Sequence, residues 1–245
     1  MIYESVNIPL WRALKPLRGQ RVLDVGCGTG ALGELLEKNG NHVTGITFSP
    51  AEAQIASARL SEVQVQDLNS QAGIEAAVRG TYPVMIFADV LEHLHDPSGT
   101  LALLLRKLEP GGRVYVSLPN IACFYVRLRL LFGQFTMSQT GGILDDTHLH
   151  FYTLRTAREL IRGAGLQIEK VDFVPAPSVW LYQILAPRGR RDAFPAFAGG
   201  RPPRMAERGL FRFYARYLYP LEHAAVRLWR TLLANQFVFT CRRRA

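Results

Sequence analysis

The chain has 245 residues, and 48% of them are hydrophobic. This is enough for one sizeable core and indicates one domain with additions, not two full domains. Its three cysteines are far apart and form no C-x-x-C pair, which argues against a disulfide framework or a zinc site and favours a cytoplasmic protein. We expect no signal peptide, because no apolar core follows a basic start. No apolar run reaches the roughly 20 residues of a membrane span.

The net charge of +9 is concentrated near the C-terminus, since 13 of the 29 basic residues and 3 of the 20 acidic ones lie in 176–245. The rest of the chain is close to neutral. This asymmetry indicates that the C-terminal part faces an anionic surface or partner, and it carries no information on the fold.

Apolar periodicity and turn residues predict alternating strands and helices. The predicted strands are 21–25, 42–47, 63–66, 84–87, 113–117, 166–174 and 237–241. The predicted helices are 30–39, 50–60 (with Ser49 as N-cap), 99–108 and 153–163. This alternation is typical of a doubly wound, mostly parallel α/β sheet with helices on both faces.

About 60 residues separate the last two predicted strands, which is too long for an ordinary loop. We therefore expect a catalytic core at 1–175, a basic, aromatic-rich helical insert at 176–234 and the last strand of the sheet at 235–245.

The first strand runs into a glycine-rich turn, Asp24-Val25-Gly26-Cys27-Gly28-Thr29-Gly30, and then into a helical pattern. Glycines let the backbone approach a ligand closely, and the helix N-terminus leaves unpaired N–H groups facing it. The turn therefore predicts a cofactor cradle. A glycine turn alone would also suit an unrelated nucleotide binder.

This turn resembles the first motif of class I S-adenosylmethionine (SAM)-dependent methyltransferases. The resemblance continues in the family's order through residues 45–50, 65–68, 87–93 and 108–112, and is nearest to the MetW-like and ubiquinone-biosynthesis methyltransferases. It implies a Rossmann-like seven-stranded sheet with an antiparallel last strand beside its predecessor. It also implies SAM as the cofactor.

By this resemblance, SAM is bound by residues at four strand ends. They are Asp24, Gly26, Cys27, Gly28 and Gly30 at the methionine moiety, Thr47 at the ribose, Asp67 and Leu68 at the adenine, and Ala88 and Asp89 near the methionine end. Thr47 stands where the family usually has Asp or Glu, and a hydroxyl accepts less strongly than a carboxylate. Glu52 or Gln54 could assist it.

Asp89, Glu92 and His93 resemble an acidic-x-x-Glu-His motif that can hold a divalent cation in ubiquinone-biosynthesis methyltransferases. Many relatives carry Leu-Glu-His without a metal. We expect no metal here.

The acceptor side resembles MetW-like sequences in the stretch 142–153, although His150 replaces their usual arginine. Removing a proton from a hydroxyl acceptor needs a base, and neutral imidazole suits this role. His148 is the candidate, oriented by Asp145 or Asp146, and His93 is the second. The alternative is a histidine that only ties the loop down.

Between 209 and 234 the chain combines dense apolar residues with a polar stripe, and Pro220 is a predicted break. The stripe comprises Arg208, Arg212, Arg216, His223, Arg227 and Arg230. Two interpretations stay open: a helix covering the core, or an interfacial element (208–230) in peripheral contact with anionic membrane. The preceding 186–208 reads as a linker.

Together these features predict a SAM-dependent methyltransferase that acts on a hydroxyl oxygen of a small acceptor: a glycan, a lipid-linked compound or a secondary metabolite. The alternatives are a non-catalytic SAM-fold partner subunit and a nucleic-acid methyltransferase. The second is not expected, because the fourth strand is followed by Ala88-Asp89-Val90-Leu91 and not by the Pro-Pro motif of such enzymes. The sequence leaves the oligomeric state open.

Overall fold

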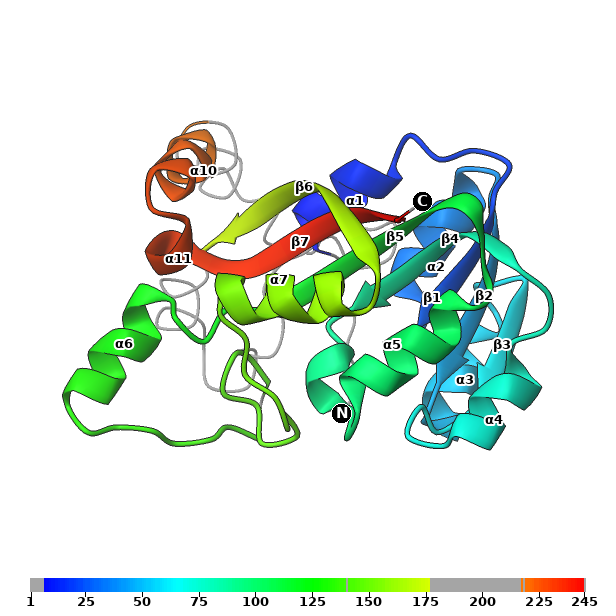
Figure 1. The fold of residues 1–245 in the computed structure, drawn as a ribbon, viewed down its shortest axis with the longest axis horizontal. Coiled ribbons are helices and arrows are strands. Elements are labelled where there is room, and N and C mark those ends of the chain that lie inside the picture. The colour runs from blue at the N-terminus through cyan, green and yellow to red at the C-terminus, as the bar shows by residue number, and fades with distance from the viewer. Residues whose placement is uncertain (1–6, 140, 177–216, 218, 245) are drawn as a thin grey trace.

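A computed structural model describes residues 7–139, 141–176, 217 and 219–244. It contains a seven-stranded sheet of order β3-β2-β1-β4-β5-β7-β6 (Figure 1). The strands are β1 (Arg21–Val25), β2 (His42–Thr47), β3 (Glu62–Val65), β4 (Tyr82–Ala88), β5 (Leu108–Pro119), β6 (Leu166–Pro175) and β7 (Ala234–Arg243). The pairs among β1 to β5 are parallel, whereas β7 lies antiparallel between β5 and β6. The predicted fold class is confirmed.

Helices cover both faces of this sheet. The helices are α1 (Ile8–Leu14), α2 (Ala31–Lys38), α3 (Pro50–Ala56), α4 (Gln71–Ala77), the 3-10 helix η1 (Leu91–His93), α5 (Pro97–Leu105), α6 (Phe124–Leu131), α7 (Leu154–Gly163), α10 (Tyr219–Leu228) and α11 (Arg230–Leu233). Side chains of α4, α5 and α7 pack on one face of the sheet, and those of α1, α2 and α3 pack on the other.

Side chains of the central strands point alternately to the two faces of the sheet, and each face has its own hydrophobic core. In β4, Met85 and Phe87 point to the α5 side, whereas Val84 and Ile86 point to the α2 side, and all four are buried. This period of two buries both faces of a parallel strand, so the strand reads as one continuous apolar run.

The structure differs from the predicted elements in several places. Helices α1, α4 and α6 were not predicted, whereas the equally short α2 and α3 were, because a glycine turn and the Ser49-Pro50 start mark where those two begin. The predicted turn at Pro110–Gly112 lies within β5, where the pairing with β4 is irregular between Tyr82 and Val84. Strand β7 begins three residues earlier than predicted, at Ala234.

Much of the predicted insert, including the linker at 186–208 and the arginines at 208, 212 and 216, lies outside the described residues. The described part contains α10 and α11, and Pro220 occupies the second position of α10, where proline is tolerated. No described helix is long and apolar enough to cross a membrane.

Candidate active site

The glycine turn joins β1 to α2 at the carboxyl edge of the sheet. Gly26, Gly28 and Gly30 have φ values of 75°, 53° and 78°, which favour glycine. The backbone N–H groups of Gly26 and Cys27 donate to the carbonyl of Ile46 at 2.9 and 2.8 Å, which ties the turn to β2. A Cβ atom on Gly26 would lie 2.7 Å from Cγ2 of Val90, so a side chain there would collide with the β4–η1 connection.

Cys27 contributes a neutral thiol to this turn. Burial is the largest cause that raises its pKa, and the charges of Asp24 and Glu52 raise it further. The thiol is therefore neither a nucleophile nor a metal ligand at neutral pH. The Cys27 side chain lies against Gly45 of β2, where a Cβ would be 2.6 Å from the Cys27 sulfur.

Asp24 is 2% exposed, and its Oδ2 atom has no hydrogen-bond partner among the described residues. Burial raises the pKa of this carboxyl group from 3.8 to about 7. A buried carboxylate oxygen without a partner is costly unless a cationic or hydrogen-bonding group approaches it. Its place beneath the glycine turn fits the amino end of a bound methionine moiety.

Thr47, at the end of β2, is 3% exposed, and its hydroxyl donates to Oε2 of Glu52 at 2.9 Å. Ser49 caps α3 by accepting the Glu52 N–H, and this cap fixes Glu52 in the first turn of the helix. A carboxylate therefore lies at the end of β2, although the strand itself ends in threonine.

Asp67 and Leu68 follow β3. The Asp67 carboxylate accepts from the backbone N–H of Asn69 at 2.8 Å and from its side chain at 3.2 Å. The Leu68 side chain is buried, and its carbonyl accepts from Thr100 at 3.2 Å. These contacts fix the chain direction where the resemblance places the adenine.

Asp89 follows Ala88 at the end of β4 and is the only described non-glycine residue with positive φ, 53°. Its two oxygens accept from Ser117 Oγ at 2.8 Å and from Gln236 Nε2 at 3.0 Å. Asn7 in turn donates to Oε1 of Gln236 at 2.9 Å, which orients that amide so that its NH₂ points to Asp89. Sequence reasoning missed Ser117, Gln236 and Asn7, because they come from three distant segments.

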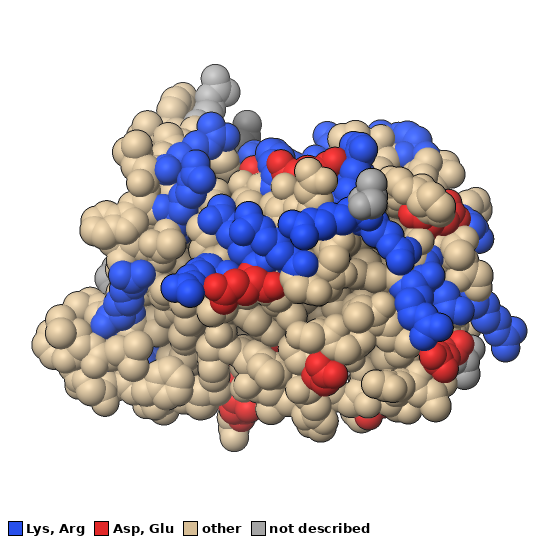
Figure 2. Space-filling model, in the orientation of Figure 1, with Lys and Arg blue, Asp and Glu red and all other residues tan. Residues whose placement is uncertain are grey.

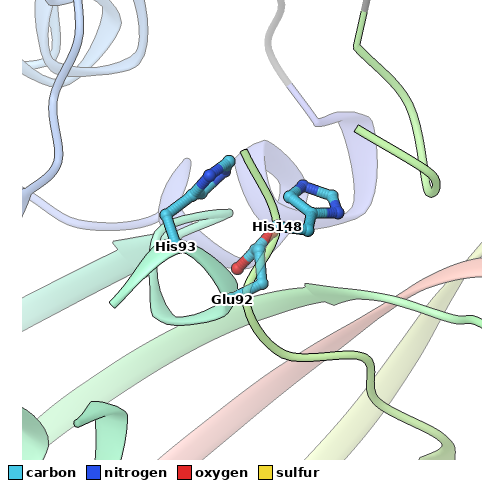
Figure 3. Close-up of side chains that lie close together, drawn as sticks. All are labelled: Glu92, His93 and His148. Carbon is cyan, nitrogen blue, oxygen red and sulfur yellow. The ribbon is translucent and has the colours of Figure 1, made fainter. Parts of the chain in front are cut away.

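Glu92, His93 and His148 form a cluster beside Asp89 (Figure 3). The first two come from η1 and the third from the loop before α7, which is held by Leu149 and His150 N–H groups donating to the Glu92 carbonyl. The two imidazole rings meet edge to face, with centroids 4.6 Å apart.

His148 lies with Nδ1 3.0 Å from the carbonyl oxygen of Ile143. A carbonyl only accepts, so Nδ1 carries the proton and Nε2 of the neutral ring keeps its lone pair. Burial, followed by the nearby His93, lowers the pKa of His148. The neutral, proton-accepting form therefore dominates at neutral pH.

Asp145 was expected to orient His148, but its Oδ1 accepts from the N–H and hydroxyl of Thr147 at 2.8 and 2.6 Å. The Thr147 hydroxyl lies 3.0 Å from Nδ1 of His93. The Asp145 carboxylate thus contacts Thr147, which lies beside His93, and the Ile143 carbonyl lies beside Nδ1 of His148. Asp146, the alternative, is exposed.

Glu92 is 1% exposed, and neither carboxylate oxygen has a hydrogen-bond partner among the described residues. Burial, with the neighbouring Asp89 charge next in size, raises its pKa well above the usual value. One oxygen of Glu92 and one nitrogen from each of His93 and His148 lie within 4.8 Å of one another, so these three could share a cation. In the acidic-x-x-Glu-His motif, Asp89 would be a metal ligand. Here it accepts hydrogen bonds from Ser117 and Gln236 instead.

A family model described as a methyltransferase domain matches residues 9–171. The chain belongs to this methyltransferase family. The match spans the glycine turn, all four strand ends of the cofactor site and the loop that carries His148.

Among curated relatives of this methyltransferase are two ubiquinone biosynthesis O-methyltransferases. The one from Xylella fastidiosa (strain 9a5c) is 32% identical over 161 residues, which is 64% of each chain. The one from Aeromonas salmonicida (strain A449) is 36% identical over 161 residues, which is 64% of this chain and 67% of the relative. The chain thus spans about two thirds of the length of these relatives.

Solved structures share the fold at low sequence identity. A SAM-dependent methyltransferase from Archaeoglobus fulgidus aligns with a TM-score of 0.58, at 15% identity over 94% of this chain and 90% of that one. The magnesium protoporphyrin IX methyltransferase of Synechocystis PCC 6803, solved with bound SAH, aligns with a TM-score of 0.57, at 16% identity over 96% and 80%. A [4+2]-cyclase, SpnF, aligns as well, with a TM-score of 0.58, at 18% identity over 96% and 79%. The shared fold therefore does not decide the reaction.

S-adenosylmethionine is the cofactor of this methyltransferase domain, and the residues present fit it. The unpartnered oxygen of Asp24 suits its cationic end, and the three glycines of the turn have the positive φ that lets the backbone approach a ligand closely.

Proposed function

We propose that the protein transfers the methyl group of SAM to a hydroxyl oxygen of a small acceptor. The names of its relatives and the geometry of His148 support this proposal. The acceptor class proposed is a glycan, a lipid-linked compound or a secondary metabolite that bears the hydroxyl.

The proposed cofactor contacts follow the strand ends. Asp24 and the turn residues Gly26, Cys27, Gly28 and Gly30 hold the methionine moiety; Thr47 with Glu52 holds the ribose; Asp67 and Leu68 hold the adenine. Ala88 and Asp89 line the side of the methionine end that faces the acceptor. Bound SAM supplies an electrophilic methyl carbon on a positively charged sulfur.

His148 is the proposed base. Nε2 takes the hydroxyl proton, an oxygen lone pair forms the new O–C bond, and the electrons of the broken C–S bond stay on sulfur. The Ile143 carbonyl stabilises the imidazolium formed, because it accepts a hydrogen bond from the Nδ1–H group in both the neutral and the charged state. The ring of His93, whose centroid lies 4.6 Å from that of His148, helps to lower the pKa of His148. It therefore favours the return of that proton to water.

The test replaces His148 with alanine. Turnover should fall by roughly 10² to 10⁴, while SAM affinity measured by calorimetry stays nearly unchanged, as for a base that does not touch the cofactor. His42→Ala is the matched control, because His42 is exposed at the start of β2. Acceptors are screened by mass spectrometry with deuterated methyl on SAM.

Unchanged turnover in His148→Ala contradicts the role of this base and moves it to His93. If methyl transfer is instead lost only after treatment with a chelator and returns with added divalent ions, the cluster holds a metal and our expectation of none is wrong.

A non-catalytic partner subunit is the second candidate. The same wild-type protein would then bind SAM by calorimetry and transfer methyl to no acceptor. A peripheral contact with anionic membrane through 208–230 is proposed as well, supported by the exposed Arg227 and Arg230 in the described part of that segment.

A further inference from the structure

Helix α6 and the loop after it expose large apolar side chains. Leu131 is 78% exposed and Phe132 70%, and Leu128, Leu130 and Phe135 are each 48% exposed. The opposite side of α6 is apolar too: Tyr125 and Val126 are buried against Ile143 and Ala176. Because one apolar side of α6 is buried in the protein, the other apolar side is exposed and is a candidate interaction surface.

A second exposed apolar group lies where α10 meets α11. Leu228 is 91% exposed and Trp229 58%. In α10, Val226 is the only described side chain that is fully buried, and Leu221 is 67% exposed. A helix that merely covered the core would turn these residues inward.

The two groups lie at the same end of the molecule's long axis, at the left of Figure 1. Hydrogen bonds connect the segment before α6 to α11. The Asn120 side chain donates to the carbonyls of Thr231 at 3.0 Å and Ala234 at 2.7 Å. Tyr125 on α6 donates to Asn235 at 2.9 Å. We call Leu131, Phe132, Phe135, Leu228 and Trp229 the end surface.

The charge around the end surface is positive. Residues 121–144 contain no Asp or Glu, and α6 carries Arg127 and Arg129. Arg227 and Arg230 flank the other group. In Figure 2 the lobe at lower left, where α6 lies in Figure 1, is tan, with Lys or Arg directly above it.

We propose that the end surface docks on an anionic lipid bilayer, with its apolar side chains in the interface and the flanking arginines on the phosphate groups. Apolar residues bordered by arginine are the composition of interfacial anchors. A two-fold contact between copies would set arginine patch against arginine patch and is disfavoured. This extends the membrane contact proposed above from 208–230 to α6.

Docking there would bring the catalytic loop to the lipid surface. Phe135 meets the ring of Phe151 at 6.0 Å between centroids, and Phe151 meets His148 at 6.2 Å. This step rests on the proposed function, whereas the docking itself does not.

The experiment measures sedimentation of the full chain with vesicles of phosphatidylcholine alone or with 30% phosphatidylglycerol. We expect binding to the anionic vesicles at low salt and release by salt. Leu131→Asp with Phe132→Asp should weaken it at least about 100-fold. Arg127→Gln with Arg129→Gln should weaken it about tenfold and reduce its salt dependence. Phe48→Asp, which adds one negative charge at a 73% exposed aromatic residue after β2, should bind as the wild type does.

Circular dichroism and thermal melting of each variant show whether it is folded, and they do not depend on SAM binding. The proposal is overturned if the wild type ignores anionic vesicles, if it binds neutral vesicles equally well, or if the aspartate variant binds unchanged. Self-association that the aspartate variant abolishes would make the end surface a contact between copies. A wild type that docks but neither binds SAM nor transfers methyl contradicts the proposed function alone.

Discussion

Asp24 and Glu92 are both buried carboxyl groups with oxygens that have no described partner, and burial raises the pKa of each. Burying an unpaired charge is unfavourable, so neither carboxylate stabilises the fold, and buried groups of this kind cluster at functional sites. Ser49 and Asn120 differ from them, because their side chains make hydrogen bonds that support the fold.

Asp24→Asn should stabilise the free protein at pH 8 and weaken SAM binding. Because the folded pKa is about 7 and the ordinary value 3.8, the native state holds a proton that the unfolded state releases between these pH values. Wild-type stability therefore falls as pH rises from 4 to 7, by about 4 kcal/mol at most. The asparagine variant should lack this fall.

Urea denaturation at pH 4 and pH 8 measures this difference, and calorimetry measures SAM affinity. If Asp24→Asn raises the free energy of unfolding equally at both pH values, the asparagine packs better and ionisation has no part in the effect.

Glu52→Gln should weaken SAM binding about tenfold, because a neutral amide replaces the carboxylate that we propose for the ribose hydroxyls. Glu62→Gln, an exposed acid on β3, is the control. Adenine-containing ligands that lack ribose hydroxyls should bind both variants alike. If SAM and these ligands lose affinity equally in Glu52→Gln, Glu52 supports α3 and not the ribose.

At the scale of elements, two of the strand ends in the candidate site are combined with the start of the helix that follows them. Thr47 shows this: β2 supplies the hydroxyl, and the first turn of α3 supplies the carboxylate. The glycine turn lies in the same way between β1 and α2, and its N–H groups donate to the Ile46 carbonyl of β2.

Gly26→Ala should destabilise the protein and reduce SAM affinity. Positive φ costs a side chain roughly 1 to 3 kcal/mol, and the new Cβ would press on Val90. Adding Val90→Ala should remove the collision and recover part of the stability, but not the backbone cost. Thermal melting of the two single variants and the double variant tests this. If the stability changes of the single variants simply add in the double variant, the new Cβ does not press on Val90.

At the scale of the whole molecule, two segments far apart in the sequence meet beside Asp89. Asn7 and Gln236 are 229 positions apart, and together they fix Asp89, whose backbone already has positive φ. The last strand, inserted between β5 and β6, brings Gln236 to this place.

Asn7→Ser should keep the cap of α1, because serine still accepts the Leu10 N–H, and lose the donor to Gln236. Without that donor the Gln236 amide can rotate its oxygen toward Asp89. We expect SAM affinity to fall up to about tenfold, with almost no change in melting temperature. Gln236→Leu should have the larger effect. An unchanged affinity in both variants would show that Asp89 needs no such support.

The sequence by itself determined the sheet, its glycine turn and the four strand ends, because these depend on local apolar runs and on glycines whose φ only glycine adopts readily. It also indicated His148. It did not show that Ile143 holds His148 while Asp145 serves Thr147 and His93, since both acids and both histidines suit the same local pattern.

Only the tertiary structure decided the contacts between distant segments. Three contacts follow from the order of the strands and the packing of the loops: Gln236 beside Asp89, Glu92 beside two histidines, and Tyr125 of α6 beside Asn235 at the start of β7. Residues far apart in the chain leave no periodic signal of their meeting. The exposure of the apolar residues in α6 became visible only in the tertiary structure, where the core is filled without them.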